Sequence, residues 1–190
     1  MIEIIAGTDR ANSNTAKVAR IVLADFQSLK TPVGLIDLAE MEFKELAGAN
    51  YRGAPPGSPW AAAVDRITKA DGVLLVVPEY NGSFPGSLKM FIDYWRYPET
   101  FEYRPMAFIG LGTRWGGLRP VEHLQQALGY RNSYIFPNRV FISNIKSVLK
   151  DGKIDDPLID ELLKVQARDF LRFVKALKDE GLSANSRLKK

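Results

Sequence analysis

The chain contains no cysteine and a single histidine among its 190 residues. The absence of cysteine excludes disulfides, thiolate metal sites and thiol nucleophiles. It also fits a reducing compartment, so we expect a cytoplasmic protein. With only His123 available, a metal ion would need carboxylates for most of its ligands, and we expect no metal site. His123 falls in a predicted helix, and we expect it on the surface or just behind a site.

Long hydrophobic runs and several familiar motifs are also missing. No apolar run approaches the length needed to cross a bilayer. The start MIEIIAG lacks the basic region and cleavage site of a secretory signal and is typical of a strand, so we expect no membrane association. There is no G-x-S-x-G of a serine hydrolase. The glycine patterns of NTP-binding loops and of dinucleotide-binding folds are absent as well.

The charge balance is only weakly basic. The formal net charge of +4 at pH 7 favours anionic partners of some kind. The basic residues are spread along the chain, and the tail SRLKK is short. Only the net charge suggests a nucleic-acid binder. Because the basic residues are spread along the chain, we expect no nucleic-acid partner.

What the sequence does contain is an alternation of apolar and amphipathic segments, with 46% hydrophobic residues and no repeat or linker. Nearly continuous hydrophobicity predicts strands that are buried on both faces. Predicted strands cover residues 2–6, 33–38, 72–77, 106–111 and 134–142. Predicted helices cover residues 14–29, 61–70, 86–95, 121–128 and 156–178.

The last predicted helix has the clearest signals. Asp156 followed by Pro157 is typical of an N-cap and a first helical residue. Helical spacing predicts one apolar stripe that faces the protein core. The stripe consists of Leu158, Leu162, Val165, Phe170, Phe173 and Leu177.

Strands that alternate with helices predict an α/β fold, a doubly wound five-stranded parallel sheet with helices on both faces, in one domain over residues 1–190. Ligands of such sheets bind beyond the carboxyl ends of the strands. The loops after the first, third and fourth predicted strands have unusual compositions. We therefore expect them to carry the function.

The loop after the first strand reads GTDRANSNT, residues 7–15. A helix N-terminus offers free backbone N–H groups and the positive end of a dipole, both suited to a phosphate. An N-cap role would account for the polar character of Ser13 or Asn14 alone. The loop holds six polar side chains in addition to Asp9, and capping does not explain the others. The phosphate contacts would come from Thr8, Arg10, Asn12, Ser13, Asn14 and Thr15.

The loop after the third strand carries a longer pattern, VVPEYNGSFPGSLKMFIDYW, residues 76–95. It resembles the P-E-Y-N-x-S-x-P-x-x-L-K signature of the NADPH-dependent FMN reductase family. The first loop is similar to that family's G-S-x-R-x-x-S-x-N, with Thr8 in place of serine and Asn14 one position early. Met90 departs from the family, which commonly has asparagine there. The matching residues are Pro78, Glu79, Tyr80, Asn81, Ser83, Pro85, Leu88 and Lys89.

The resemblance implies a flavodoxin-like sheet of order 2-1-3-4-5 and an enzyme that passes electrons from NADPH or NADH through FMN to a small acceptor. Acceptors in the family include quinones, free flavin, azo compounds, ferric complexes and chromate. The resemblance also implies a homodimer or a dimer of dimers. No catalytic side chain is expected, since hydride transfer rests on orientation. The FMN-binding residues implied are Thr8, Arg10, Ser13, Asn14, Thr15, Pro78, Glu79, Tyr80, Asn81, Gly82, Ser83, Thr113, Trp115 and Gly116.

Some of these residues allow more than one role. Trp115 is bulkier than its counterparts in many relatives, and stacking on flavin, lining a substrate pocket and interface packing are equal alternatives. Glu79 is expected to be structural, bridging to a basic residue or to a partner subunit. Lys89 is expected to pair locally in its helix. Arg114 and Arg119 are candidates for the phosphates of NADPH.

A second class of protein also fits, a flavodoxin-like FMN electron carrier that is reduced by a protein partner. Such carriers tend to be acidic and lack P-E-Y-N-G-S, whereas this chain is basic. Direct reduction by NADPH separates the two hypotheses.

Overall fold

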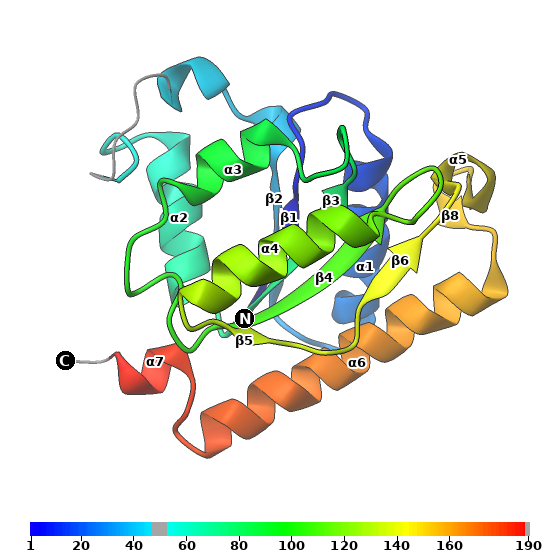
Figure 1. Cartoon of the computed structure of the whole chain (residues 1–190). Helices are drawn as coiled ribbons and strands as arrows, with labels where there is room; N and C mark the ends of the chain where they lie inside the picture. Colours follow the sequence, from blue (N-terminus) through cyan, green and yellow to red (C-terminus); the bar gives the residue numbers. More distant parts are fainter. Residues whose placement is uncertain (47–52, 189–190) are drawn as a thin grey trace.

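A parallel β-sheet forms the centre of the protein in a computed structural model, which describes residues 1–46 and 53–188 (Figure 1). The strand order is β2-β1-β3-β4-β5, and a sixth strand, β6, also pairs with β4. This confirms the predicted order 2-1-3-4-5. The strands are β1 (Ile2–Ala6), β2 (Val33–Asp37), β3 (Gly72–Pro78), β4 (Pro105–Leu111), β5 (Tyr134–Ile135) and β6 (Val140–Ile142).

The burial of the strands explains their continuous hydrophobicity. β1 pairs with β2 on one side and β3 on the other, so that Ile2 lies opposite both Val33 and Gly72. Every residue of β1 and β4 is buried, whereas the first three residues of the edge strand β2 are only half-buried. Strands covered on both faces are mostly apolar, and the one charged residue of β1, Glu3, is buried in an ion pair with Arg66 Nη2 at 2.6 Å.

The fifth predicted strand is interrupted, and its prediction as one strand over 134–142 is wrong. β5 and β6 both pair with β4, but Pro137 lies between them and has no N–H to donate to a neighbouring strand. The side chain of Gln166 fills the gap: its Nε2 donates to Phe108 O and to Asn138 O, both at 2.9 Å. A buried amide thus replaces the missing ladder bonds.

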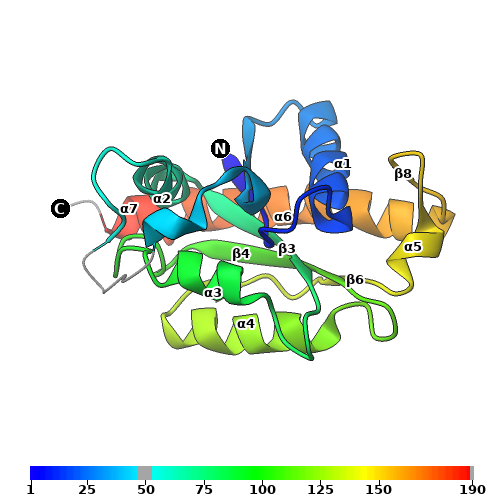
Figure 2. The same cartoon turned by 90° about the horizontal axis from the view of Figure 1, so that it is seen from above.

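Helices cover both faces of the sheet, as predicted (Figure 2). α1 and α6 pack on one face, around a core cluster that includes Ile4, Val22 and Phe170. α2, α3 and α4 pack on the other, around Trp60 and Phe91. The helices are α1 (Asn14–Ser28), α2 (Pro59–Lys69), α3 (Gly86–Ile92), α4 (Leu118–Tyr130), α5 (Ile145–Val148), α6 (Pro157–Asp179) and α7 (Ala184–Arg187).

Smaller elements complete the described chain. Two 3₁₀ turns, Leu38–Glu40 and Phe43–Leu46, follow β2. A short antiparallel hairpin, β7 (Leu149–Lys150) and β8 (Lys153–Ile154), precedes α6. Within the described residues, none of the helices combines the length and the apolar character needed to span a bilayer.

α6 begins as predicted but buries a different stripe. Asp156 is its N-cap and accepts hydrogen bonds from the backbone N–H groups of Leu158 and Ile159. Leu158 and Leu162 are 67% and 37% exposed, so their placement in the core-facing stripe is wrong. The buried face also includes Gln166 and Ala167, which an apolar pattern passes over. Its residues are Leu163, Gln166, Ala167, Phe170 and Val174.

Two helix boundaries also differ from prediction. α4 begins three residues earlier than predicted, directly after Gly117, whose φ of 77° is in the left-handed region. α3 ends at Ile92, three residues earlier than predicted. The early start of α4 brings its first turn next to the loop that follows β4, at the carboxyl edge of the sheet.

Candidate functional site

A cavity of about 520 Å³ opens at the carboxyl edge of the sheet, where loops from four strands meet. Its volume is within the range of small-molecule and cofactor sites. The first loop contributes Arg10, Ala11, Asn12, Ser13, Asn14 and Thr15. The loops after β3, β4 and β6 contribute Pro78, Glu79, Tyr80, Leu111, Gly112, Thr113, Ile145 and Lys146.

The first loop presents the N-terminus of α1 to this cavity. Ser13 is the N-cap, and its Oγ accepts a hydrogen bond from Ala16 N at 3.0 Å. The first turn of α1 contains no acidic residue, so no carboxylate of its own offsets the positive end of the helix dipole. Arg10 is exposed at the cavity and forms no ion pair within the described residues. This end of the cavity suits an anion.

Gly7 allows the first loop to approach the sheet closely. A Cβ at this position would lie 2.9 Å from Leu88 Cδ2 and 3.0 Å from Val76 O. The first contact is closer than real Cβ atoms adopt and the second is tighter than most of them, so a larger residue at this position would have to displace Leu88 or the loop. The loop is thereby held against β3 and α3.

The second loop contains a tight turn, Tyr80–Ser83. Tyr80 N donates to Ser83 O at 2.8 Å, and Ser83 N donates to Tyr80 O at 3.1 Å. The φ values of Asn81 and Gly82 are 51° and 79°, which is the reason for an Asn-Gly pair at the tip. Asn81 and Gly82 line a hollow beside the third loop.

Two side-chain hydrogen bonds hold the base of this turn. Tyr80 Oη and Thr8 Oγ1 are 2.8 Å apart, which ties the turn to the first loop. Ser83 Oγ and His123 Nδ1 are 2.9 Å apart, which ties it to α4. Thr8 is fully buried, so its hydroxyl serves the turn and lines neither cavity.

The third loop forms a second hollow of about 260 Å³, lined by Glu79, Asn81, Gly82, Thr113, Arg114 and Trp115. Glu79 and Thr113 line both hollows, so the two are adjacent. Trp115 is 62% exposed, with the Arg114 guanidinium 5.9 Å from its ring centroid. An exposed indole at the rim of a polar cavity offers a stacking surface to a planar molecule.

The structure brings most of the predicted residues together. Those that line one or both hollows are Arg10, Ser13, Asn14, Thr15, Pro78, Glu79, Tyr80, Asn81, Gly82, Thr113 and Trp115. Thr8, Ser83 and Gly116 line neither. Gly116, with a φ of 60°, packs against β6, where a Cβ would lie 3.0 Å from Phe141 C. These three residues support the loops from behind.

Ile145 and Lys146 line the cavity but were not predicted. They belong to the segment after β6, which Asn144 N joins to the third loop by a hydrogen bond to Thr113 O at 3.0 Å. This segment has no unusual composition. Only its position could have indicated a role in the site, because the loop after the fifth strand begins at the same edge of the sheet as the other three loops.

Other residues considered from the sequence lie elsewhere or have local partners. Lys89 Nζ lies 2.7 Å from Asp93 Oδ1, which confirms the predicted local pair. Glu79 forms no ion pair with any described residue of its own chain. No cluster of three or more histidine or carboxylate groups that could hold a metal occurs in the described chain.

The residues present fit a flavin mononucleotide. The helix N-terminus, Arg10 and the neutral donors of the first loop suit a phosphate. Gly112 lines the larger hollow and Gly82 the smaller one, and neither has a side chain to occupy the space. An open doubly wound sheet with such a phosphate end and an Asn-Gly turn defines a flavodoxin-like protein with a mononucleotide site.

Comparison with known proteins identifies the family. The sequence profile described as NADPH-dependent FMN reductase matches residues 1–147, and the chain belongs to this family. It is therefore an FMN-dependent oxidoreductase that uses a nicotinamide cofactor. A quinone reductase of Pseudomonas putida is 30% identical over 161 residues, 82% of this chain and 84% of the relative. An NADPH azoreductase of a Bacillus species is 24% identical over 182 residues, 93% and 96% of the two chains.

Solved structures agree on the fold. FerB, a flavoenzyme NAD(P)H:(acceptor) oxidoreductase from Paracoccus denitrificans, has a TM-score of 0.72 at 22% identity, over 92% of this chain and 97% of FerB. The NADH:FMN oxidoreductase EMOB has a TM-score of 0.73 at 21% identity, over 89% and 87%. Flavodoxin 2 from Bacillus cereus is more distant, with a TM-score of 0.63 at 15% identity, over 90% and 98%. Since the matching family is that of the reductases, the electron-carrier alternative is not favoured.

Proposed function

We propose that the chain, as a single domain over residues 1–190, binds FMN with its phosphate at the N-terminus of α1. Arg10 and the first-turn N–H groups would hold the phosphate, with Ser13, Asn14 and Thr15 beside it. The ring would lie between the turn Tyr80–Ser83 and the third loop, against Glu79 and Thr113. The observation that carries this proposal is the convergence of three polar loops on one cavity at the carboxyl edge.

When bound, FMN supplies the redox chemistry, taking a hydride from NADPH and releasing electrons to an acceptor. The protein contributes orientation. The turn backbone would face the polar edge of the ring, and Trp115 at the rim would provide a surface for whichever partner occupies the open side. Because reductant and acceptor would use the same side in turn, we expect ping-pong kinetics.

We propose a quinone or an azo compound as the acceptor class. The relatives named above are a quinone reductase and an NADPH azoreductase. Planar acceptors of this kind match the exposed indole of Trp115. Arg114 beside it, unpaired within the described chain, would favour acceptors that carry an anionic group.

We further propose that the protein is a homodimer or a dimer of dimers and that it works in the cytoplasm. Tyr97 and Tyr130 are 55% and 79% exposed, and the Arg131 guanidinium lies 4.9 Å and 5.2 Å from their ring centroids. Exposed tyrosine and arginine are enriched at subunit interfaces. The cysteine-free composition supports a reducing compartment. Sedimentation of the wild type and of Tyr130→Glu tests the interface: the variant should shift toward a smaller species.

The decisive experiment is an anaerobic titration of the FMN-loaded protein with NADPH, followed by loss of the oxidised flavin absorbance. Bleaching within the mixing time, reversed on addition of a naphthoquinone, is the expected result. A bound flavin that stays oxidised with both NADPH and NADH would contradict the reductase assignment. Failure of the apoprotein to take up FMN would overturn the placement of the cofactor.

A further inference from the structure

The turn Tyr80–Ser83 depends on contacts from outside itself. Within the turn there are only the two backbone hydrogen bonds between Tyr80 and Ser83. An isolated two-stranded turn of this size is at best marginally stable in water. Its tip, Asn81 and Gly82, lines the second hollow and has one exposed and one half-buried residue. The base of the turn is therefore where its position is set.

α4 supplies the contacts on one side of that base. His123 Nδ1 lies 2.9 Å from Ser83 Oγ, and His123 is half-buried. Arg119, one helical turn earlier on the same face, lies against Gly82: its Nη1 would be 3.4 Å from a Cβ at that position. Two neighbouring residues of α4 thus face the same turn.

α4 also begins where the third loop ends. Gly117 is the N-cap of α4, and a Cβ at Gly117 would lie 2.4 Å from Leu111 N, so the start of the helix is seated directly on β4. The helix therefore has a fixed position relative to the third loop. A hydrogen bond from α4 to Ser83 consequently fixes the distance between the two loops that border the proposed ring site.

We propose that His123 is a positioning residue for the flavin ring, acting through Ser83 on the turn that faces the ring. This rests on the proposed FMN site. His123 lines neither hollow, so it has no direct contact with the space assigned to the cofactor. Without the hydrogen bond, the turn would have to be ordered when the ring binds, at a cost in affinity. Since the effect is at the ring end, riboflavin and FMN should be affected equally.

The test compares His123→Leu with His123→Asn. Leucine has a similar volume and no hydrogen-bonding group, whereas the asparagine amide places a polar atom close to the position of Nδ1. Apoprotein of each variant is titrated with FMN and with riboflavin by quenching of flavin fluorescence. We expect His123→Leu to weaken both ligands about tenfold, the value of one hydrogen bond. His123→Asn should bind within about threefold of the wild type.

A double-mutant cycle with Ser83→Ala identifies the route. If His123 acts through Ser83, adding Ser83→Ala to His123→Leu should produce no further loss of flavin affinity. Thermal unfolding of each apoprotein checks that the variants fold. His123→Asn is the matched control, because it changes the same position of α4 as His123→Leu.

The outcomes separate two kinds of failure. Wild-type affinity in His123→Leu, equal weakening in His123→Asn, or additive losses in the cycle would each overturn the role of His123 while leaving FMN binding intact. Failure of the wild-type apoprotein to bind either flavin would instead overturn the proposed function, and the role of His123 with it.

Discussion

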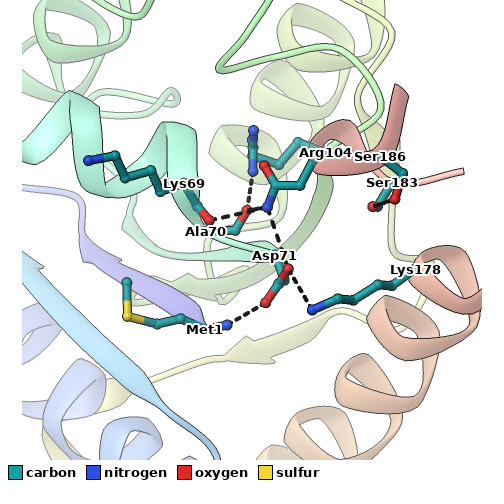
Figure 3. A network of polar contacts seen from close by, with 9 residues as sticks. Met1, Lys69, Ala70, Asp71, Arg104, Lys178, Ser183 and Ser186 are labelled. Carbon is teal, nitrogen blue, oxygen red and sulfur yellow. Dashed lines mark hydrogen bonds and ion pairs between the residues drawn. The ribbon is translucent and has the colours of Figure 1, made fainter. Parts of the chain in front are cut away.

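The amino edge of the sheet, where the strands begin, and the carboxyl edge, where they end, use polar side chains in opposite ways. At the amino edge, Asp71 accepts from the Met1 amino group and from Lys178 Nζ at 3.3 Å (Figure 3). Arg104 is 1% exposed and donates to backbone carbonyls. At the carboxyl edge, Arg10, Lys146 and Glu79 line a cavity and form no ion pair within the described chain.

The contrast separates structural from functional polarity. A cavity of about 450 Å³ also lies at the amino edge, so the presence of a hollow does not distinguish the two. The two edges differ instead in whether their polar groups have hydrogen-bond or ion-pair partners. Burial raises the pKa of Asp71, but hydrogen bonds and charge from the Met1 amino group and Lys178 outweigh this effect and leave the pKa below its ordinary value. Groups that already have partners stabilise the fold, while groups without partners at a cavity are available to a ligand.

The largest expected effect is that of Arg104→Ala. The guanidinium donates to the carbonyl oxygens of Thr68, Ala70, Glu99 and Thr100. Its removal takes a charged donor from each of them, and Ala70 O keeps only its hydrogen bond from Asn185 Nδ2. Burial lowers the pKa of Arg104 to about 10, with Asp71 opposing, so the group remains charged at neutral pH. We expect a loss of about 3 kcal/mol in the free energy of unfolding, measured with urea.

Flavin affinity provides the control for this variant. Under conditions where Arg104→Ala is folded, FMN should bind as it does to the wild type, because Arg104 lies at the opposite edge from the proposed site. A loss of stability below about 1 kcal/mol would contradict the structural role. Weakened FMN binding without loss of stability would show that Arg104 serves binding, and would contradict the structural role given to the amino edge.

Arg10→Ala should have the converse result. Removing a charge-assisted phosphate contact should weaken FMN about tenfold to a hundredfold and leave riboflavin affinity and stability unchanged. Ser13→Ala is less selective, because Ser13 also caps α1 and its loss should lower stability by about 1 kcal/mol. Equal weakening of FMN and riboflavin in Arg10→Ala would place the phosphate elsewhere; Lys146→Ala is then the next variant to titrate.

The same contrast explains how much of the fold could be predicted. Strands such as β1 and β4 are buried on both faces, and with the exception of Glu3 their residues are apolar or small. The loops of the site were recognisable because polar residues gather directly after the strands, in GTDRANSNT and PEYNGS. The break between β5 and β6 was not predicted, although Pro137 signals it, because the substitute donor, Gln166, comes from α6.

Contacts between distant segments account for the remaining misses. Nothing near His123 in the sequence indicates Ser83 as its partner, 40 residues away. Lys146 lines the cavity from a segment that a hydrogen bond from Asn144 N to Thr113 O joins to the third loop. Leu158 and Leu162 are exposed because the buried face of α6 is centred on Leu163, Phe170 and Val174, to one side of both leucines. Such features depend on packing, and a local pattern does not contain them.

Asp25, a half-buried residue of α1, extends the comparison to a group that lines neither cavity. Burial raises its pKa to about 6, with Lys164 lowering and Asp160 raising it, and its Oδ2 is buried without a hydrogen-bond partner. A carboxyl group whose pKa is raised on folding stabilises the protein fully below its unfolded pKa of about 4, and this contribution is lost as the pH rises through 6.

Asp25→Asn should therefore be more stable than the wild type at pH 8. Because the side chain is only half-buried, solvent screening limits the expected gain to about 1 kcal/mol, and the two proteins should be alike near pH 4. Urea unfolding at both pH values measures the difference. A variant that is less stable than the wild type at pH 8 would show that the charge of Asp25 has a stabilising partner.

Trp115→Ala should have the smallest effect and is the most informative about the rim of the site. With 62% of its surface exposed, Trp115 contributes little to stability, so the free energy of unfolding should be unchanged. If the indole stacks on the acceptor, KM for a naphthoquinone should rise about threefold while FMN affinity stays the same, and Trp115→Phe should retain most of the wild-type value. A tenfold loss of FMN affinity would instead place the indole on the flavin. A shift in sedimentation with unchanged KM would place it between subunits, and the carboxyl edge would then be partly structural.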